Sequence, residues 1–292
     1  MVGHLPGEVV AALACPLDAA PMSEDADGLH CPHGHRFDRA RQGHVTLIAR
    51  PLRHAGDSAD QVARRRAVHD AGILQAVHDA VVAEATATPL PPGLVVDLGA
   101  GPGTYLAATL DALPDRAGLA VDVSRAAARR ATRCHPRAGA IVADVWDRVP
   151  LRDGTAALVL VVFAPRSGGE PARLLVPGGT LLVVTPGPSH LAELRARTPA
   201  LAIAAGKDDE VAGTLGPEVR TAATRRITDR REVARELALD LLAMGPSGHH
   251  LEAGDLERVA AQLPATLTVT IDVHLRRLVR TAATPGAGHG DR

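Results

Sequence analysis

Near the start of the chain, two cysteines, an aspartate and a histidine have the spacing of a metal site. Cys15 and Asp18 occupy the places of a C-x-x-C pair, and Cys31 and His35 follow after thirteen residues. Structural zinc sites mostly use thiolate and imidazole ligands, but zinc also accepts a carboxylate oxygen. These four residues therefore predict a zinc knuckle in which a carboxylate replaces one thiolate.

Three outcomes are open for this segment. In the first, zinc is bound through Asp18, or through His30 or His33 as a replacement ligand, since His33 shares the face of the other ligands on an extended segment. In the second, the knuckle holds no metal and is kept in place by apolar packing. The side chains available for that packing are Leu17, Phe37 and Val45. In the third, the zinc is catalytic and keeps an open coordination position.

A second set of residues combines glycines with three carboxylates. The stretch DLGAGPG (97–103) follows an apolar run and precedes a helical pattern, so its backbone can turn sharply and approach a ligand. Asp97 precedes the loop. Asp122 ends the second apolar run and can accept hydrogen bonds from both hydroxyls of a ribose, and Asp144 ends the third run at the depth of an adenine amine. The alternative for the glycine loop is a purely structural turn. The alternative for Asp122 and Asp144 is that these acids are simply solvated at the ends of their strands.

A parallel α/β sheet is predicted to position these acids. From Leu94 onward, short apolar runs alternate with helical patterns, as is typical of such a sheet. A PGG turn at 177–179 precedes the last of these runs, and a helical stretch from Ala59 to Thr86 lies upstream of a proline-rich break at 86–93. The predicted strands are 94–99, 118–123, 140–144, 156–164 and 180–186.

Near the end of the chain, the stretch LTVTIDVHL (267–275) alternates apolar and polar residues. This period of two predicts an edge-type or antiparallel strand with one solvent-exposed face. The residues of that face are Thr268, Thr270, Asp272 and His274. The tail, 283–292, is predicted to be disordered.

The bulk composition narrows the class of protein. The 292 residues can bury one good core with a small appendage, and a net charge of −1 gives no overall basic field. With one Trp, one Tyr and two Phe in the chain, we do not expect an aromatic-rich RNA-binding sheet. Three cysteines are too few for a disulfide scaffold, and we find neither a signal peptide nor an apolar run of about 20 residues. The prediction is a cytoplasmic protein with no membrane span.

The order of short motifs along the chain resembles one known family. Those motifs are CPL-D, CPxGHxFD (31–38), GHVxL (43–47), GDS (56–58), ARR (63–65), the glycine loop, VPL (149–151), FAP (163–165), PGG, TPGPxHLxEL (185–194), MGP (244–246) and DVHL (272–275). In this order they resemble the large-subunit ribosomal RNA (guanine-N1)-methyltransferases, a family that includes macrolide-resistance enzymes of the tylosin type. The similarity runs from Cys15 to about Arg277.

The resemblance implies an α/β fold: a Rossmann-like class I methyltransferase domain with a small N-terminal zinc-knuckle-like domain. The implied divisions are the knuckle at 1–50, a helical linker at 51–92 and the S-adenosylmethionine-dependent domain at 93–282. The implied zinc ligands are Cys15, Asp18, Cys31 and His35. The residues expected to bind S-adenosylmethionine are Asp97, Gly99, Gly101, Gly103, Tyr105, Asp122, Val123, Asp144, Val145 and Phe163.

The resemblance also implies methyl transfer to N1 of a guanine, which calls for a base or for stabilisation of the anion. The sequence names no clear base. Candidates are His190 and Glu193, with structural or surface roles as the alternative, and the segment 163–165 is expected to hold the acceptor. Trp146 either covers an adenine or fills the core.

Large-subunit ribosomal RNA is the implied partner, and any phosphate contact has to be local. Residues 33–66 hold eight arginines against three acids, a net charge of +5. The alternative is a solvated helix face, with some of Arg64, Arg65 and Arg66 paired to Asp57 or Asp60. A small-molecule substrate, a non-catalytic RNA-binding module and a homodimer are left open.

Overall fold

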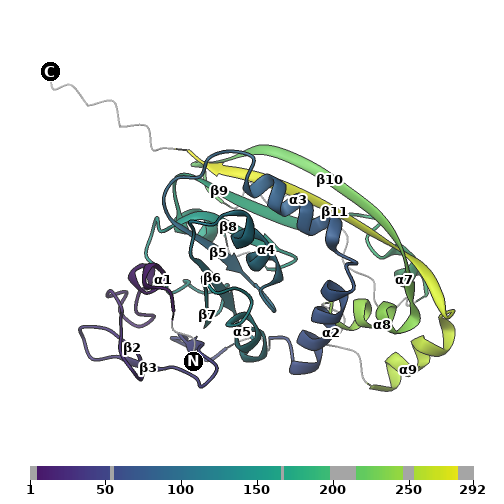
Figure 1. The fold of residues 1–292 in the computed structure, drawn as a ribbon, viewed down its shortest axis with the longest axis horizontal. Coiled ribbons are helices and arrows are strands. Elements are labelled where there is room, and N and C mark those ends of the chain that lie inside the picture. The colour runs from purple at the N-terminus through teal and green to yellow at the C-terminus, as the bar shows by residue number, and fades with distance from the viewer. Residues whose placement is uncertain (1–4, 53–55, 166–167, 198–214, 246–252, 282–292) are drawn as a thin grey trace.

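The computed structural model describes residues 5–52, 56–165, 168–197, 215–245 and 253–281. An eight-stranded mixed sheet forms its centre, in the order β10-β11-β9-β8-β5-β6-β7-β4 (Figure 1). The strands are β4 (Val45–Thr46), β5 (Leu94–Leu98), β6 (Gly118–Asp122), β7 (Ala138–Val142), β8 (Ala156–Val162), β9 (Leu175–Pro186), β10 (Val219–Ala234) and β11 (Thr266–Arg280). Strands β4 to β9 run parallel, while β11 is antiparallel to both β9 and β10.

The order of the central strands fixes where a ligand can bind. From β5 the chain proceeds outward through β6 and β7, and then returns to the other side of β5 with β8 and β9. This reversal places a topological switch point between β5 and β8. In open α/β sheets, ligands bind outside the carboxyl ends of the strands at such a point. Strands β5 and β8 are buried along their whole length, as their continuous apolar sequences predict.

Helices cover both faces of the sheet (Figure 1). One core joins the sheet to α3 (Gln75–Ala85), α4 (Thr104–Ala112) and α8 (Arg235–Ala243). The core on the opposite face includes α1 (Gly7–Ala12) and α6 (Glu170–Leu174). The other described helices are α2 (Ala59–Asp70), α5 (Arg125–Ala131), α7 (Ala192–Arg197) and α9 (Ala253–Gln262).

The N-terminal segment forms a small antiparallel sheet that is attached to the main one. Its strands are β1 (Ser23–Glu24), β2 (Gly28–His30) and β3 (Arg36–Asp38). Directly after them, β4 joins the edge of the main sheet by pairing in parallel with β7. Val9, Leu13 and Cys15 are buried in the same core as Ile141 of β7. The segment therefore shares its core with the large sheet, and the boundary at residue 50 stays a prediction.

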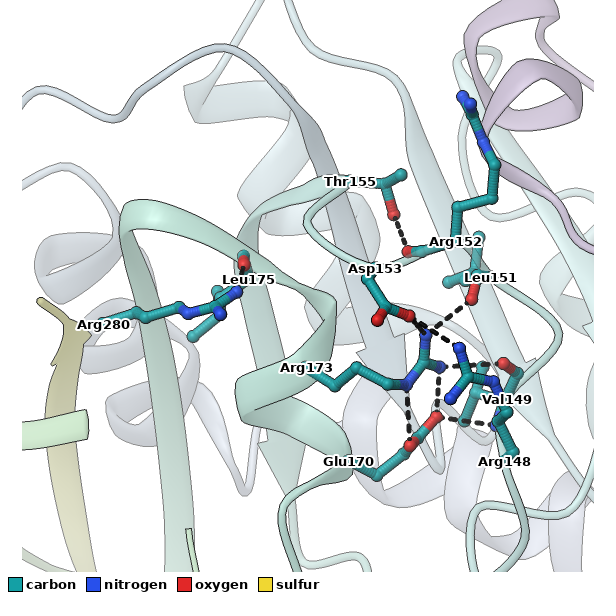
Figure 2. Close-up of polar contacts among 10 residues, drawn as sticks. All are labelled: Arg148, Val149, Leu151, Arg152, Asp153, Thr155, Glu170, Arg173, Leu175 and Arg280. Carbon is teal, nitrogen blue, oxygen red and sulfur yellow. Dashed lines mark hydrogen bonds and ion pairs between the residues drawn. The ribbon is translucent and has the colours of Figure 1, made fainter. Parts of the chain in front are cut away.

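Arg173 of α6 holds the VPL segment (149–151), against which the N-terminal segment packs (Figure 2). Its guanidinium donates to the carbonyl oxygens of Val149 (3.0 Å) and Leu151 (2.7 Å), and it pairs with Glu170 and Asp153. Next to these carbonyls, the N–H of Ala14 donates to Pro150 O at 3.0 Å, and Leu13 and Leu151 form an antiparallel bridge. The VPL motif (149–151) is therefore the part of the main domain that binds the backbone just before Cys15.

Several predicted elements differ in the structure. The helical stretch predicted at 59–86 is two helices, because Gly72 adopts a positive φ of 70° between α2 and α3. The PGG sequence is an irregularity within β9, where Leu175 pairs with Ala156 and Thr180 pairs with Leu158. The predicted strand at 140–144 lies at 138–142, so Asp144 stands two residues beyond its end.

The alternating strand was predicted correctly as antiparallel, but β11 is not at the sheet edge. The edge is β10, which the sequence analysis missed. The predicted solvent-exposed face is also wrong in part, because Thr270 and Asp272 are buried. Beyond Pro186, the β10–β11 ladder continues as a two-stranded arm that leads into α8 and α9 (Figure 1). The predicted disordered tail, 283–292, lies outside the described residues.

Candidate cofactor site and metal centre

The glycine loop lies at the switch point, between β5 and α4, and is packed on three sides. All three of its glycines have positive φ: 73° at Gly99, 55° at Gly101 and 80° at Gly103. A Cβ on Gly99 would lie 2.4 Å from the Ala164 side chain, and a Cβ on Gly103 would lie 2.9 Å from the Cys134 sulfur. A Cβ on Gly101 would lie 3.3 Å from the Arg65 side chain. The loop thus needs glycine for its conformation and for these close approaches.

Asp97, at the end of β5, is buried without a compensating charge. Its side chain is 1% exposed, and its Oδ2 atom has no hydrogen-bond partner in the described part of the chain. Burial, together with the nearby Asp122 carboxylate, raises the pKa of Asp97 to about 7. A buried carboxylate with an unpaired oxygen is suited to bind a cation that comes from outside the protein.

Asp122 and Asp144 follow the next two strands. Asp122 is half-buried and accepts hydrogen bonds from the N–H groups of Gly101 and Ser124, each at 2.8 Å, and burial raises its pKa. Asp144 accepts from the N–H of Trp146 at 2.9 Å through one oxygen. A carboxylate has about four acceptor positions, so each acid keeps some for a ligand. The Trp146 side chain is 53% exposed, so the core-filling alternative is wrong.

The other predicted cofactor residues occupy two kinds of position. Val123, Val145 and Phe163 follow β6, β7 and β8 at the carboxyl edge, and Phe163 has a strained positive φ of 54°. Tyr105 instead points back into the helical layer. Its ring stacks on His78 with centroids 4.1 Å apart, and burial raises the pKa of its hydroxyl well above the usual value.

These residues fit S-adenosylmethionine. The orphan oxygen of Asp97 suits the ammonium group, and the remaining acceptor positions of Asp122 suit the ribose hydroxyls. Asp144, one strand further along the same edge, suits an adenine amine. Their order follows β5, β6 and β7, so the acceptors succeed one another along the carboxyl edge. A separate cavity of about 640 Å³ is lined by Pro102, Thr104 and Cys134 together with residues of α2, α3 and α4. None of the three acids lines it.

His190 and Glu193 are both engaged in structural contacts. His190 Nδ1 accepts from the N–H of Asp272 at 3.3 Å, and burial lowers the pKa of this imidazole to about 4. Glu193 accepts from the N–H of Thr270 at 2.9 Å and from its hydroxyl at 2.6 Å. The His190 ring lies 5.7 Å from that of Phe163, so it is close to the carboxyl edge of the sheet. With Nδ1 accepting, neutral His190 carries its proton on Nε2.

Asp272 is the residue that the sequence analysis missed here. Although fully buried, it accepts two hydrogen bonds from Arg226, at 2.8 and 2.9 Å, and one from the N–H of Ser189 at 2.9 Å. Bonding to Arg226 lowers the pKa of Asp272 to about 2. This carboxylate therefore fixes the TPGPSHL loop (185–191) on β11. The signal in the sequence is a lone acid inside an apolar alternation, and the period of two by itself predicts a solvent-exposed side chain there.

The four predicted metal ligands come together at the N-terminus. Their ligand atoms all lie within 4.8 Å of one another. His35 Nδ1 is 3.5 Å from Cys15 Sγ, 3.4 Å from Cys31 Sγ and 3.2 Å from Asp18 Oδ2, and Cys31 Sγ is 3.7 Å from Asp18 Oδ2. Zinc bonds of roughly 2.0–2.3 Å give tetrahedral edges of roughly 3.3–3.8 Å. The donor set and its spacing therefore fit tetrahedral zinc.

Of the proposed replacement ligands, His33 approaches the group. Its Nδ1 lies 2.6 Å from Asp18 Oδ2, while the N–H of Ala20 donates to Asp18 Oδ1. Hydrogen bonds from Ala20 and His33 lower the pKa of Asp18, which keeps it ionised as a metal ligand must be. His30 instead faces Asp25. Leu17 is 53% exposed, which removes one of the side chains that a metal-free knuckle would pack.

The arginines of residues 33–66 are largely ion-paired. Arg36 and Arg39 pair with Asp25 and Glu24 of the N-terminal segment, at 2.6 and 2.5 Å. The pairs made by α2 are Arg64 with Asp60 and Asp240, Arg65 with Asp57, and Arg66 with Asp70. The paired alternative therefore holds for Arg64 and Arg65, and the net charge of this stretch overstates what is free to bind phosphate.

No helix among the described residues is long and apolar enough to cross a membrane.

Several known proteins are similar to this chain. A zinc-ribbon family model described as "RlmA, N-terminal" matches residues 13–54, which include all four predicted metal ligands. A 23S rRNA (guanine(748)-N(1))-methyltransferase of Streptomyces fradiae is 43% identical over 91% of this chain and 95% of its own length. A Micromonospora griseorubida protein named for the same kind of reaction is 42% identical over 91% and 96%. The YcgJ protein of Bacillus subtilis, a solved structure, has a TM-score of 0.47 at 14% identity and covers 70% of this chain and 100% of its own.

A glycine loop at the switch point, three acids along the carboxyl edge and an antiparallel β10–β11 pair define a Rossmann-like methyltransferase fold with an N-terminal zinc ribbon. Within that class, the chain belongs to the family of 23S rRNA (guanine-N1)-methyltransferases. The family resemblance and the fold class predicted from the sequence are both confirmed.

Proposed function

We propose that this protein transfers a methyl group from S-adenosylmethionine to N1 of a guanine in 23S rRNA. The observation that carries the proposal is the 43% identity to the Streptomyces fradiae enzyme over nearly the whole of both chains. Guanine 748, which the name of that relative specifies, is the first nucleotide to test. A cytoplasmic location, where ribosomal RNA is found, belongs to the same proposal.

The cofactor supplies a methyl group on a positively charged sulfur, and the chain supplies mainly position and charge. Asp97 binds the ammonium group, Asp122 the ribose and Asp144 the adenine amine, while the glycine loop admits the ligand close to the backbone. The segment after β8, with Phe163, lies at the switch point and holds the acceptor base. His190, with its proton on Nε2, acts there as a hydrogen-bond donor and not as the base, and the proton that guanine N1 loses on methylation passes to solvent water.

The N-terminal ribbon holds zinc through Cys15, Asp18, Cys31 and His35 in a structural site. Four protein ligands would fill the tetrahedral coordination that zinc prefers, which argues against a catalytic zinc with an open position. The zinc would stabilise the ribbon, which is attached to the edge of the main sheet through β4 and the VPL segment. The ribbon would then be held in a fixed position for contact with RNA. A homodimer stays a prediction, which light scattering after size-exclusion chromatography tests.

The function is tested with unmodified 23S rRNA, both as a transcript and in large subunits from a strain that lacks the modification. The purified protein and radiolabelled S-adenosylmethionine are expected to label the RNA. Primer extension then stops one nucleotide before the target, because a methyl on N1 blocks Watson–Crick pairing. Asp122→Ala should lose the activity, while Asp115→Asn, an exposed acid beyond α4, should keep it.

Absence of both label and stop on every RNA would reject the proposal. Methyl transfer to a low-molecular-weight acceptor, insensitive to salt and to RNA, would favour the small-molecule alternative instead. Reduced macrolide susceptibility in a host that expresses the active protein, but not Asp122→Ala, would assign resistance to the same reaction.

A further inference from the structure

The ARR motif places an arginine against the glycine loop. Arg65 of α2 lies so close to Gly101 that a Cβ on that glycine would be 3.3 Å from Arg65 Cδ and 3.8 Å from Nε. Arg65 belongs to a helix more than thirty residues upstream, and nothing in the loop itself predicts this contact. Its side chain is 23% exposed, so it lines the edge of the site without being enclosed by it.

The guanidinium is held in place from two directions. Nε and Nη2 donate to Asp57 Oδ2 at 3.1 and 2.7 Å, and Nη2 also donates to the carbonyl oxygen of Met244, at the end of α8, at 2.7 Å. Asp57 is itself anchored, because its carbonyl oxygen accepts from the Ser124 hydroxyl at 2.6 Å. Nη1 has no hydrogen-bond partner among the residues that the structure describes, so one donor arm is fixed but unused.

The proposed cofactor has one group that the three acids cannot bind. Its amino-acid end carries a carboxylate beside the ammonium and the sulfonium. Asp97 and Asp122 suit the cations and hydroxyls, but they would repel this carboxylate. A guanidinium is the side chain that recognises carboxylates best. Arg65 is in contact with the loop over which the amino-acid end lies when the ammonium is on Asp97.

We propose that Arg65 binds the carboxylate of S-adenosylmethionine, and that the GDS and ARR motifs form one unit, an anchoring acid and a clamp, that closes the cofactor site from α2. This inference rests on the proposed function, since it presupposes the cofactor. The competing role for Arg65 is structural: it would only tie α2 to the end of α8. Arg64 has that second role without the loop contact, because it pairs with Asp240 of α8 at 2.8 Å.

The test compares two ligands that differ only in the carboxylate. These are S-adenosylhomocysteine and its decarboxylated form, S-adenosyl-3-thiopropylamine, titrated calorimetrically into the full chain. The wild type is expected to prefer the carboxylate-bearing ligand by roughly 10- to 100-fold, the range of one hydrogen bond to a charged group. Arg65→Gln should reduce that preference to less than about threefold, by weakening S-adenosylhomocysteine binding alone. Arg64→Gln is the matched control and should keep the preference of the wild type.

Two results would overturn the inference. One is a wild type that binds both ligands equally, a measurement that needs no variant. The other is an Arg65→Gln protein that weakens both ligands alike, as loss of the α2–α8 tie would. If the Gln variant does not fold, Arg65→Lys keeps the charge and should retain part of the preference. A wild type that binds neither ligand would instead reject the proposed function.

Discussion

Asp97 offers a quantitative test of the cofactor site. When no ligand is bound, its buried and ionised carboxylate should lower the free energy of unfolding. Burial raises the pKa of Asp97 from 3.8 to about 7 in the folded protein. That rise of about three pKa units corresponds to about 4 kcal/mol when the group is fully ionised. The folded state binds the proton more tightly than the unfolded state does, so the penalty is absent below about pH 4. It grows as the pH rises, and is complete above about pH 7.

Asp97→Asn removes the ionisable group and keeps the shape. We expect the stability advantage of the ligand-free variant over the wild type to grow by about 3 kcal/mol as the pH is raised from 5 to 8, because part of the full penalty of about 4 kcal/mol is already present at pH 5. The same variant should lose roughly 10- to 100-fold in affinity for S-adenosylhomocysteine, since it cannot offer a charge to the ammonium. The wild type should release a proton on binding near pH 6.5.

Urea unfolding at both pH values, and calorimetric titration in buffers of different ionisation enthalpy, measure these effects. Asp115→Asn, at an exposed acid, is the control and should change neither quantity. If the stability difference between Asp97→Asn and the wild type were the same at pH 5 and pH 8, the carboxylate would not be the buried, uncompensated charge that the site requires.

Three further predictions follow from contacts elsewhere. Asp272→Ala should cost about 1–3 kcal/mol in chemical unfolding, because the N–H of Ser189 and the half-exposed Arg226 lose their acceptor; the folded pKa of Asp272 is lowered to about 2, so the wild type keeps this stabilisation above pH 4 and loses it as the pH falls toward 2. Gly99→Ala should cost about 1–3 kcal/mol and abolish cofactor binding in calorimetry, since its Cβ would meet Ala164 at 2.4 Å; unchanged binding would contradict the tight loop. Asp18→Cys should slow zinc loss to a colorimetric chelator and Asp18→Ala should accelerate it, whereas equal rates for all three proteins would remove Asp18 from the ligand set.

Local sequence determined the elements whose signals are contained in a few neighbouring residues. The apolar runs at β5 and β8 are buried on both faces, so their pattern needs no partner to be interpreted. The glycine loop could be placed because glycine adopts its positive φ angles without the steric cost that other residues meet there. The metal group was predictable because its ligands come in two short-range pairs. Cys31 and His35 lie four residues apart, and Cys15 and Asp18 have the spacing of a C-x-x-C pair.

Only the tertiary structure decided what distant residues do to one another. The edge strand β10 escaped prediction because an exposed edge needs no apolar alternation, and most of its residues are exposed, including Arg225, which pairs with Glu84 of α3. Asp272 is polar in an apolar pattern, and its burial depends on Arg226 from the neighbouring strand. Arg65 reaches the glycine loop because α2 packs beside α8 and α5. Charge and burial at these positions are properties of pairs brought together by folding, and sequence periodicity describes each strand or helix alone.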